Sequence, residues 1–152
     1  MKAIVHQYKK GVEGLECKFL PETNPNAGEV KVKLKAAGLN HRDLFIINNR
    51  KEMDLPLVIG SDGSGIVTEI GEGVSNHLLN NEVIINPSIG WDNIAEVPEL
   101  PEVLGGPKDG TFAEYVIVPA ENVVAKPSYL TWEESGVLSL SALTAYRALF
   151  TK

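Results

Sequence analysis

The segment from residue 30 to residue 36 constrains the fold of this chain more than any other stretch. Apolar side chains alternate there with lysines, the apolar ones being Val30, Val32, Leu34 and Ala36 and the charged ones Lys31, Lys33 and Lys35. Successive side chains of a β-strand point to opposite faces, so this period of two predicts a strand with one buried face. The three lysines are expected to lie on the solvent face.

Other short segments rich in β-branched and aromatic residues predict further strands at 1–6, 14–20, 57–70, 82–86 and 112–119. Turn-forming Gly, Pro and Asn residues separate several of these segments, as expected for a barrel or a sandwich. Glycines at positions 60, 63 and 65 favour a bulge or a close backbone approach within 57–70. The chain is therefore predicted to be mainly β.

Two segments are expected to be helical. Residues 40–48 fit a short helix, and Thr131 with Glu134 forms a capping box, which predicts a helix that starts at residue 131 and continues through the apolar positions up to residue 149. Between the strands, residues 87–110 are rich in Pro, Gly and Asn without periodicity, which predicts a long lobe on the surface.

Composition limits the partners and the location. The chain has 152 residues, which favours one domain, and a net charge of -6 with 14 scattered basic residues, which disfavours nucleic acid. No stretch approaches the roughly 20 apolar residues of a membrane span, and residues 1–7 do not begin a signal peptide, so a cytoplasmic protein is expected. The single cysteine, Cys17, has no internal disulfide partner and is expected to be a half-buried strand residue.

Four ordered segments resemble the medium-chain dehydrogenase/reductase superfamily: AAGLNHRDL at 36–44, LVIGSDGSGIVTEIGEGV at 57–74, GTFAEYVIVPAENVVAKP at 110–127 and LTWEESGVLSLSALTAYRAL at 130–149. The resemblance implies a GroES-like catalytic domain at 1–130, built as a partly open β-barrel with a short helix. It also implies that 131–152 begin the helix that leads to a Rossmann domain. That domain is expected to be missing, because no strand, glycine-rich turn and helix form a complete GxGxxG unit here.

The resemblance further implies a small-molecule substrate, a homodimer at full length, and NADP or NAD bound mainly by the missing domain. The 152 residues alone are therefore expected to be inactive. In the zinc branch of the superfamily, metal ligands stand at the positions that match Asn40 and Ser61, and at about Leu140 or, as glutamate, Val137. Carboxamide, hydroxyl and aliphatic side chains are poor zinc ligands, so no zinc is expected.

The residues at these positions resemble instead the zinc-lacking quinone oxidoreductase and enoyl-reductase-like branch. The resemblance implies candidate catalytic residues Asn40 and Asp43, candidate cofactor-binding residues Asn40 and Thr144, and a substrate wall that includes Phe45, Ser61 and Asp62. Three of these residues have a structural alternative: Asn40 is a good helix N-cap, Asp43 in the first turn favours the helix dipole, and Thr144 inside a helix could bond to its own backbone.

The expected function is the reduction of quinones or α,β-unsaturated carbonyl compounds by NAD(P)H without a metal electrophile. Phe45 stands where some quinone oxidoreductases carry a tyrosine, which weakens the assignment of a quinone. Two alternatives stay open at this point: a zinc-dependent alcohol dehydrogenase, and a non-catalytic GroES-like module that binds a protein partner.

Overall fold

The computed structural model describes residues 1–91, 93, 96–99 and 101–150, and it is mainly β, as predicted. Strands β1 (Lys2–His6), β2 (Leu15–Phe19) and β4 (Leu57–Val58) form a sheet in the order β2-β1-β4. A larger sheet has the order β10-β6-β5-β3-β9, from β3 (Glu29–Gly38), β5 (Asp62–Ile70), β6 (Glu82–Ile85), β9 (Tyr115–Pro119) and β10 (Val123–Ala125). Two short strands, β7 (Ser88–Ile89) and β8 (Glu102–Val103), pair with each other.

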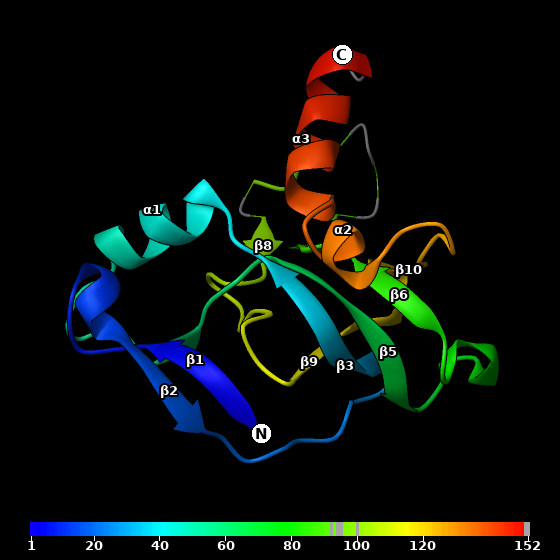
Figure 1. Cartoon of the computed structure of the whole chain (residues 1–152), viewed down its shortest axis with the longest axis horizontal. Helices are drawn as coiled ribbons and strands as arrows, with labels where there is room; N and C mark the ends of the chain where they lie inside the picture. The colour runs from blue at the N-terminus through cyan, green and yellow to red at the C-terminus, as the bar shows by residue number, and fades with distance from the viewer. Residues whose placement is uncertain (92, 94–95, 100, 151–152) are drawn as a thin grey trace.

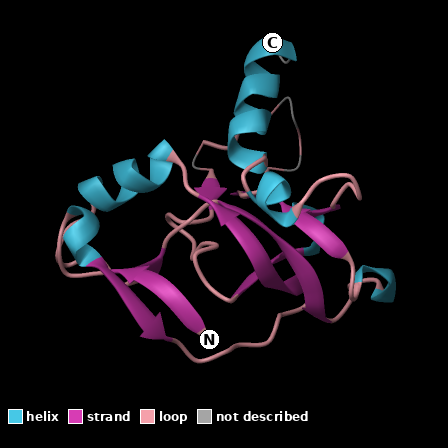
Figure 2. Cartoon of the chain, viewed as in Figure 1, coloured by secondary structure: helices cyan, strands magenta, loops and turns pink. Residues whose placement is uncertain are grey.

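The helices lie at the edges of this arrangement. They are α1 (His41–Asn49), α2 (Trp132–Gly136) and α3 (Ser139–Phe150), with short 3₁₀ turns η1 (Gly11–Gly14), η2 (Asn76–Leu78) and η3 (Ala120–Asn122). Figures 1 and 2 show α1 beside η1 at one end of the first sheet, and α3 extending away from the larger sheet, which its first turn contacts at the start of β5. None of the helices in the described residues is long and apolar enough to cross a membrane.

The main core lies on the larger sheet and is built from aliphatic side chains. Its fully buried members include Val30, Val32, Val67, Ile85 and Val118. The apolar side of the predicted alternation in 30–36 is therefore confirmed at Val30 and Val32, which are both completely buried. This core holds β3 and β5 in place, and these two strands lead into the candidate site.

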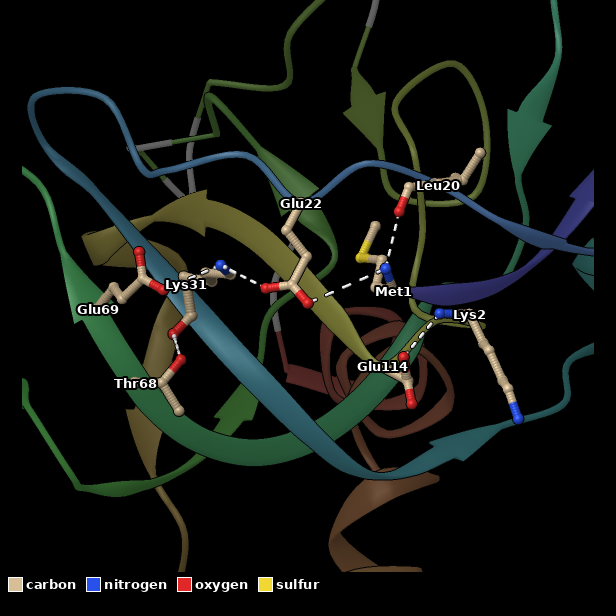
Figure 3. Close-up of polar contacts among 8 residues, drawn as sticks. All are labelled: Met1, Lys2, Leu20, Glu22, Lys31, Thr68, Glu69 and Glu114. Atoms are coloured by element: carbon tan, nitrogen blue, oxygen red, sulfur yellow. Dashed lines mark hydrogen bonds and ion pairs between the residues drawn. The ribbon is translucent and has the colours of Figure 1, made fainter.

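The prediction that Lys31 faces solvent is wrong, because its side chain is only 4% exposed. The chain before β3 crosses the face on which Lys31 lies and brings Glu22 over it (Figure 3). Lys31 Nζ lies 2.9 Å from Glu69 Oε1 and 3.1 Å from Glu22 Oε2. The hydrogen bond to Glu69 is the largest effect that raises the pKa of Lys31 above its ordinary value, and Glu22 adds to it. Both carboxylates keep the buried ammonium charged.

Other predictions also need correction. Cys17 lies on β2 but is exposed rather than half-buried. The predicted strand 57–70 is two strands, because the chain leaves the first sheet after Val58 and joins the second at Asp62. The lobe at 87–110 is not wholly superficial, since Leu104 is 1% exposed and belongs to the main core.

The single helix predicted from Thr131 is divided into α2 and α3. The capping box forms as predicted, with Glu134 N–H donating to Thr131 Oγ1 at 3.1 Å and Thr131 N–H donating to Glu134 Oε2 at 2.8 Å. Helix α2 then ends at Gly136, whose backbone packs so closely on β3 that a Cβ there would lie 2.8 Å from the Cβ of Ala36. The capping signal is local and readable, whereas the break depends on this distant contact.

Candidate functional site

The N-terminus of α1 brings two candidate residues together. Asn40 is the N-cap residue, in an extended backbone conformation, and the Asp43 carboxylate accepts a hydrogen bond from the Asn40 N–H at 2.7 Å. This satisfies one of the backbone donors that a helix start leaves free. Asn40 therefore serves as the helix N-cap, and Asp43 lies in the first turn of the helix. The Asn40 carboxamide points out of the helix toward Asp62 on β5.

The Asn40 carboxamide is part of a hydrogen-bonded chain across three elements. Asn40 Nδ2 donates to Asp62 Oδ2 at 2.9 Å, and Asp62 Oδ1 accepts from the Leu140 backbone N–H at 2.7 Å. Asp62 is 1% exposed, so both bonds form away from water. We name this chain of groups the 40-62-140 relay. It fixes the start of α1, the start of β5 and the first turn of α3 relative to one another.

A second network lies next to the relay and is centred on Arg42. Its Nη1 donates to Ser61 Oγ at 3.0 Å and to the Leu104 carbonyl oxygen at 3.1 Å, and its Nη2 donates to the Gly106 carbonyl oxygen. Ser61 Oγ in turn donates to the Leu104 carbonyl oxygen at 3.0 Å. The guanidinium therefore fastens the buried part of the 87–110 lobe to α1 and to the entry into β5.

Asp43 carries an unusual buried oxygen. The residue is 4% exposed, and its Oδ1 has no hydrogen-bond partner among the described residues. Burial raises the pKa of the Asp43 carboxyl, against the opposing effects of the Asn40 N–H and the Arg42 charge. A buried carboxyl with a raised pKa and an unsatisfied oxygen makes Asp43 a candidate functional residue.

Phe45 and Thr144 are both exposed. Phe45 is 64% exposed on the outer side of α1, which leaves its ring free to contact a ligand. The Thr144 hydroxyl donates to the Leu140 carbonyl oxygen at 2.7 Å, so the helix-bonded role is realised and the oxygen offers only lone pairs to a ligand. Thr144 lines a hollow of about 250 Å³ that it shares with Leu143 and Trp91.

Ser61 and Asp62, by contrast, are 0% and 1% exposed. Residues with so little surface lie behind the predicted substrate wall rather than on it. Their hydrogen bonds indicate that they hold Arg42 and Asn40 in position. Sequence reasoning missed Arg42, although an arginine in the first turn of α1, two residues after the N-cap, was a usable signal.

The donor set at the positions that hold metal in the zinc branch does not suit zinc. Those positions carry the Asn40 carboxamide, the Ser61 hydroxyl and the aliphatic Leu140, and the first two are already engaged in hydrogen bonds. Zinc is held by thiolate, imidazole or carboxylate ligands. Over the described part of the chain, no group of three or more His, Cys, Asp or Glu residues is arranged to hold a metal ion.

Comparison with known proteins identifies the family of this domain. Residues 26–128 match the family of alcohol dehydrogenase GroES-like domains. A zinc-type alcohol dehydrogenase-like protein of Schizosaccharomyces pombe is 36% identical over 156 residues, covering 99% of this chain and 44% of that protein. The crystal structure of an NAD-dependent alcohol dehydrogenase superposes with a TM-score of 0.88 at 37% identity, covering 97% of this chain and 46% of the other.

A quinone oxidoreductase from Coxiella burnetii also superposes, with a TM-score of 0.79 at 25% identity, over 98% of this chain and 44% of the other. Fold and matched residues together define a GroES-like domain of the oxidoreductase type. The chain belongs to the medium-chain dehydrogenase/reductase superfamily, and its residues 26–128 form the alcohol dehydrogenase GroES-like domain. It spans less than half the length of these relatives.

Proposed function

We propose that this chain forms the catalytic domain of an NADP- or NAD-dependent oxidoreductase that reduces quinones or α,β-unsaturated carbonyl compounds without zinc. The observation that supports this proposal is the 40-62-140 relay. Two of the three places where the zinc branch gathers metal ligands, Asn40 and Leu140, are bonded through the Asp62 carboxylate, next to the third place, Ser61. A relay of satisfied hydrogen bonds stabilises this arrangement without a cation.

The nicotinamide supplies the hydride when it is bound, and a second domain is needed to hold its nucleotide. In the proposed enzyme, a quinone takes up one hydride and one proton to become a hydroquinone. Asn40, whose carboxamide is held in one orientation by Asp62, would hold the nicotinamide end of the cofactor. Thr144 would contribute an acceptor oxygen there, since its own proton is already donated to the Leu140 carbonyl oxygen.

Asp43 and Arg42 act as positioning residues in this proposal. Asp43 holds the Asn40 backbone N–H, and Arg42 holds the lobe that closes one side of the site. Phe45 contributes an apolar surface to the substrate wall, where it excludes water from the reacting atoms. Fixed orientation of the reacting groups is the main contribution that such a domain makes to hydride transfer.

The test is a hydride-transfer assay on a protein that joins this chain to its nucleotide-binding domain, with a naphthoquinone and cyclohexenone as acceptors. We expect turnover without added metal, and a decrease in kcat of about a hundredfold for Asn40→Ala, because loss of orientation costs about that much. Asn49→Ala, on the same helix, is the matched control and should retain activity. Indifference to both acceptors together with zinc-dependent alcohol oxidation would overturn the proposal.

A further inference from the structure

The free edge of the first sheet is formed by β2. The strand order β2-β1-β4 gives this strand one paired side, toward β1, and one outer side on which no strand of the described residues lies. In Figure 1 it is the outermost strand on its side of the molecule. Its last residue, Phe19, is 79% exposed. An unpaired edge with an exposed aromatic ring is a surface to which a further strand can be added.

The backbone of β2 shows which of its residues face the free edge. At the two ends of the ladder with β1, the Gln7 N–H donates to the Gly14 carbonyl oxygen at 2.9 Å, and the Leu20 N–H donates to the Met1 carbonyl oxygen at 2.8 Å. In an antiparallel ladder, residues that bond to the neighbouring strand alternate with residues whose N–H and C=O point the other way. The even-numbered residues of β2 therefore bond to β1. The odd-numbered residues direct their N–H and C=O groups to the free edge, and these are Leu15, Cys17 and Phe19.

The sequence of β2, Leu-Glu-Cys-Lys-Phe, is complementary to itself when a second copy runs antiparallel to it. Placing Cys17 opposite Cys17 of the copy brings Glu16 opposite Lys18, and it brings the apolar side chains at the two ends of the strand opposite one another. Both charged side chains are partly exposed, and within one chain Lys18 Nζ lies 3.5 Å from Glu16 Oε2, so they share a face of the sheet. Opposite charges stabilise a cross-strand pair and like charges destabilise it. Two-fold registers centred on Glu16 or Lys18 bring like charges together, so the charges select the register centred on Cys17.

We propose that β2 pairs antiparallel with β2 of a second copy of this chain, around a two-fold axis at Cys17. The two three-stranded sheets then join into one continuous sheet. The edge groups of Leu15 bond to those of Phe19 of the other copy, and the Phe19 ring packs on Leu15, which removes apolar surface from water. A contact of this size lies at the small end of specific interfaces, so the dimer forms at high protein concentration. None of these residues belongs to the candidate site, so the proposal is independent of the proposed function.

Sedimentation equilibrium over a range of concentrations measures this dimer, and reversal of one charge tests its register. Glu16→Lys and Lys18→Glu each place like charges opposite one another at both symmetric positions, so we expect each variant alone to associate about tenfold more weakly than the wild type. A mixture of the two variants restores opposite charges and should associate like the wild type. Glu72→Lys, the same charge change at an exposed position outside β2, is the matched control and should also associate like the wild type.

Three results of this experiment would overturn the proposal. They are a wild-type chain that stays monomeric at millimolar concentration, a mixture that associates as weakly as the single variants, and a dimer that neither variant weakens, since its contact would lie elsewhere. Misfolding of a variant cannot imitate the expected result, because mixing two misfolded chains would not restore association.

Cys17 supplies a second test of the register. The Cα atoms of a hydrogen-bonded antiparallel pair lie about 5.5 Å apart, within the range of about 4.4 to 6.8 Å that a disulfide spans. With oxidised glutathione as the oxidant, two Cys17 thiols lose two protons and two electrons to form one disulfide, and one molecule of oxidised glutathione becomes two of glutathione. Because pairing holds the two thiols together, we expect Cys17 to cross-link about tenfold faster than the single cysteine of Cys17→Ser combined with Tyr129→Cys, at an 83% exposed position. Equal rates would mean that random collision alone joins the chains, which would overturn the register.

Discussion

His6 is a single residue that links the stability of the first sheet to pH. It is 1% exposed, its Nε2 lies 3.0 Å from the Gly11 carbonyl oxygen, and Arg50 Nε lies 3.1 Å from its Nδ1. A carbonyl only accepts and an arginine only donates, so the ring is neutral with its proton on Nε2. Burial lowers the pKa of His6, with the Arg50 charge adding to the effect and Asp54 opposing it.

Because the folded pKa lies below the unfolded value of about 6.5, the unfolded chain takes up a proton that the folded chain rejects. The contribution of His6 to stability is therefore complete above about pH 6.5 and decreases as the pH falls. We expect the melting temperature of the wild type to fall when the pH is lowered through about 6.5, and that of His6→Gln to fall less over the same range. His77→Gln, at an exposed histidine, should behave like the wild type. Equal slopes for all three proteins would contradict this account.

The pKa of Asp43 is shifted in the opposite direction from that of His6, so its effect on stability also changes with pH in the opposite direction. Its folded pKa is raised, so the carboxylate form is disfavoured in the folded chain at neutral pH and the penalty disappears below the unfolded pKa of about 4. We expect Asp43→Asn to raise the melting temperature at pH 7 by about 3 °C, as a gain of about 1 kcal/mol does in a chain of this size. The gain should vanish near pH 3. Glu52→Gln, at an exposed position, is the control variant. A melting temperature of Asp43→Asn below that of the wild type at pH 7 would show that the carboxylate stabilises the fold, which would contradict this account.

At the scale of elements, the end of the 87–110 lobe packs backbone against backbone on the segment that connects β4 to β5. A Cβ on Gly110 would lie 2.0 Å from the Gly60 carbonyl oxygen and 2.7 Å from that of Ile59. We expect Gly110→Ala to reduce the free energy of unfolding by about 3 kcal/mol in urea denaturation, the upper part of the usual range for overpacking. Gly73→Ala, where open space surrounds the site and only the left-handed backbone resists, should lose about 1 kcal/mol.

Sequence patterns identified most elements, because their signals are local. The alternation at 30–36, the apolar run after Asn40 and the capping box at Thr131 each predicted an element that the structure contains. The break after Val58, the division of the last helix at Gly136 and the burial of Lys31 were not predictable in this way. Each depends on a contact with a segment distant in sequence, and such a contact produces no periodic pattern in the local sequence.

At the scale of the whole molecule, the candidate site is assembled from three places that only the fold brings together. Positions 40, 61 and 140 were related through resemblance to a family, and the bonds that join Asn40 and Leu140 to Asp62 follow from the packing of α1, β5 and α3. The role of Asp62 as the shared acceptor and the backbone carbonyl partners of Arg42 were visible only in three dimensions. The residue types at these positions indicated a site without metal ligands, and the fold determined which groups hydrogen-bond to one another there.

The central claim is that the 40-62-140 relay takes the place of a metal centre, and the zinc content of the purified chain tests it most directly. After equilibration with zinc and removal of the excess, elemental analysis should find far less than one zinc per chain. Asn40→Cys, Ser61→His and Leu140→Cys combined in one protein provide thiolate and imidazole ligands and should raise the content to about one. A wild-type chain that retains about one zinc, lost on changing Asn40 or Asp62 to alanine, would contradict the account.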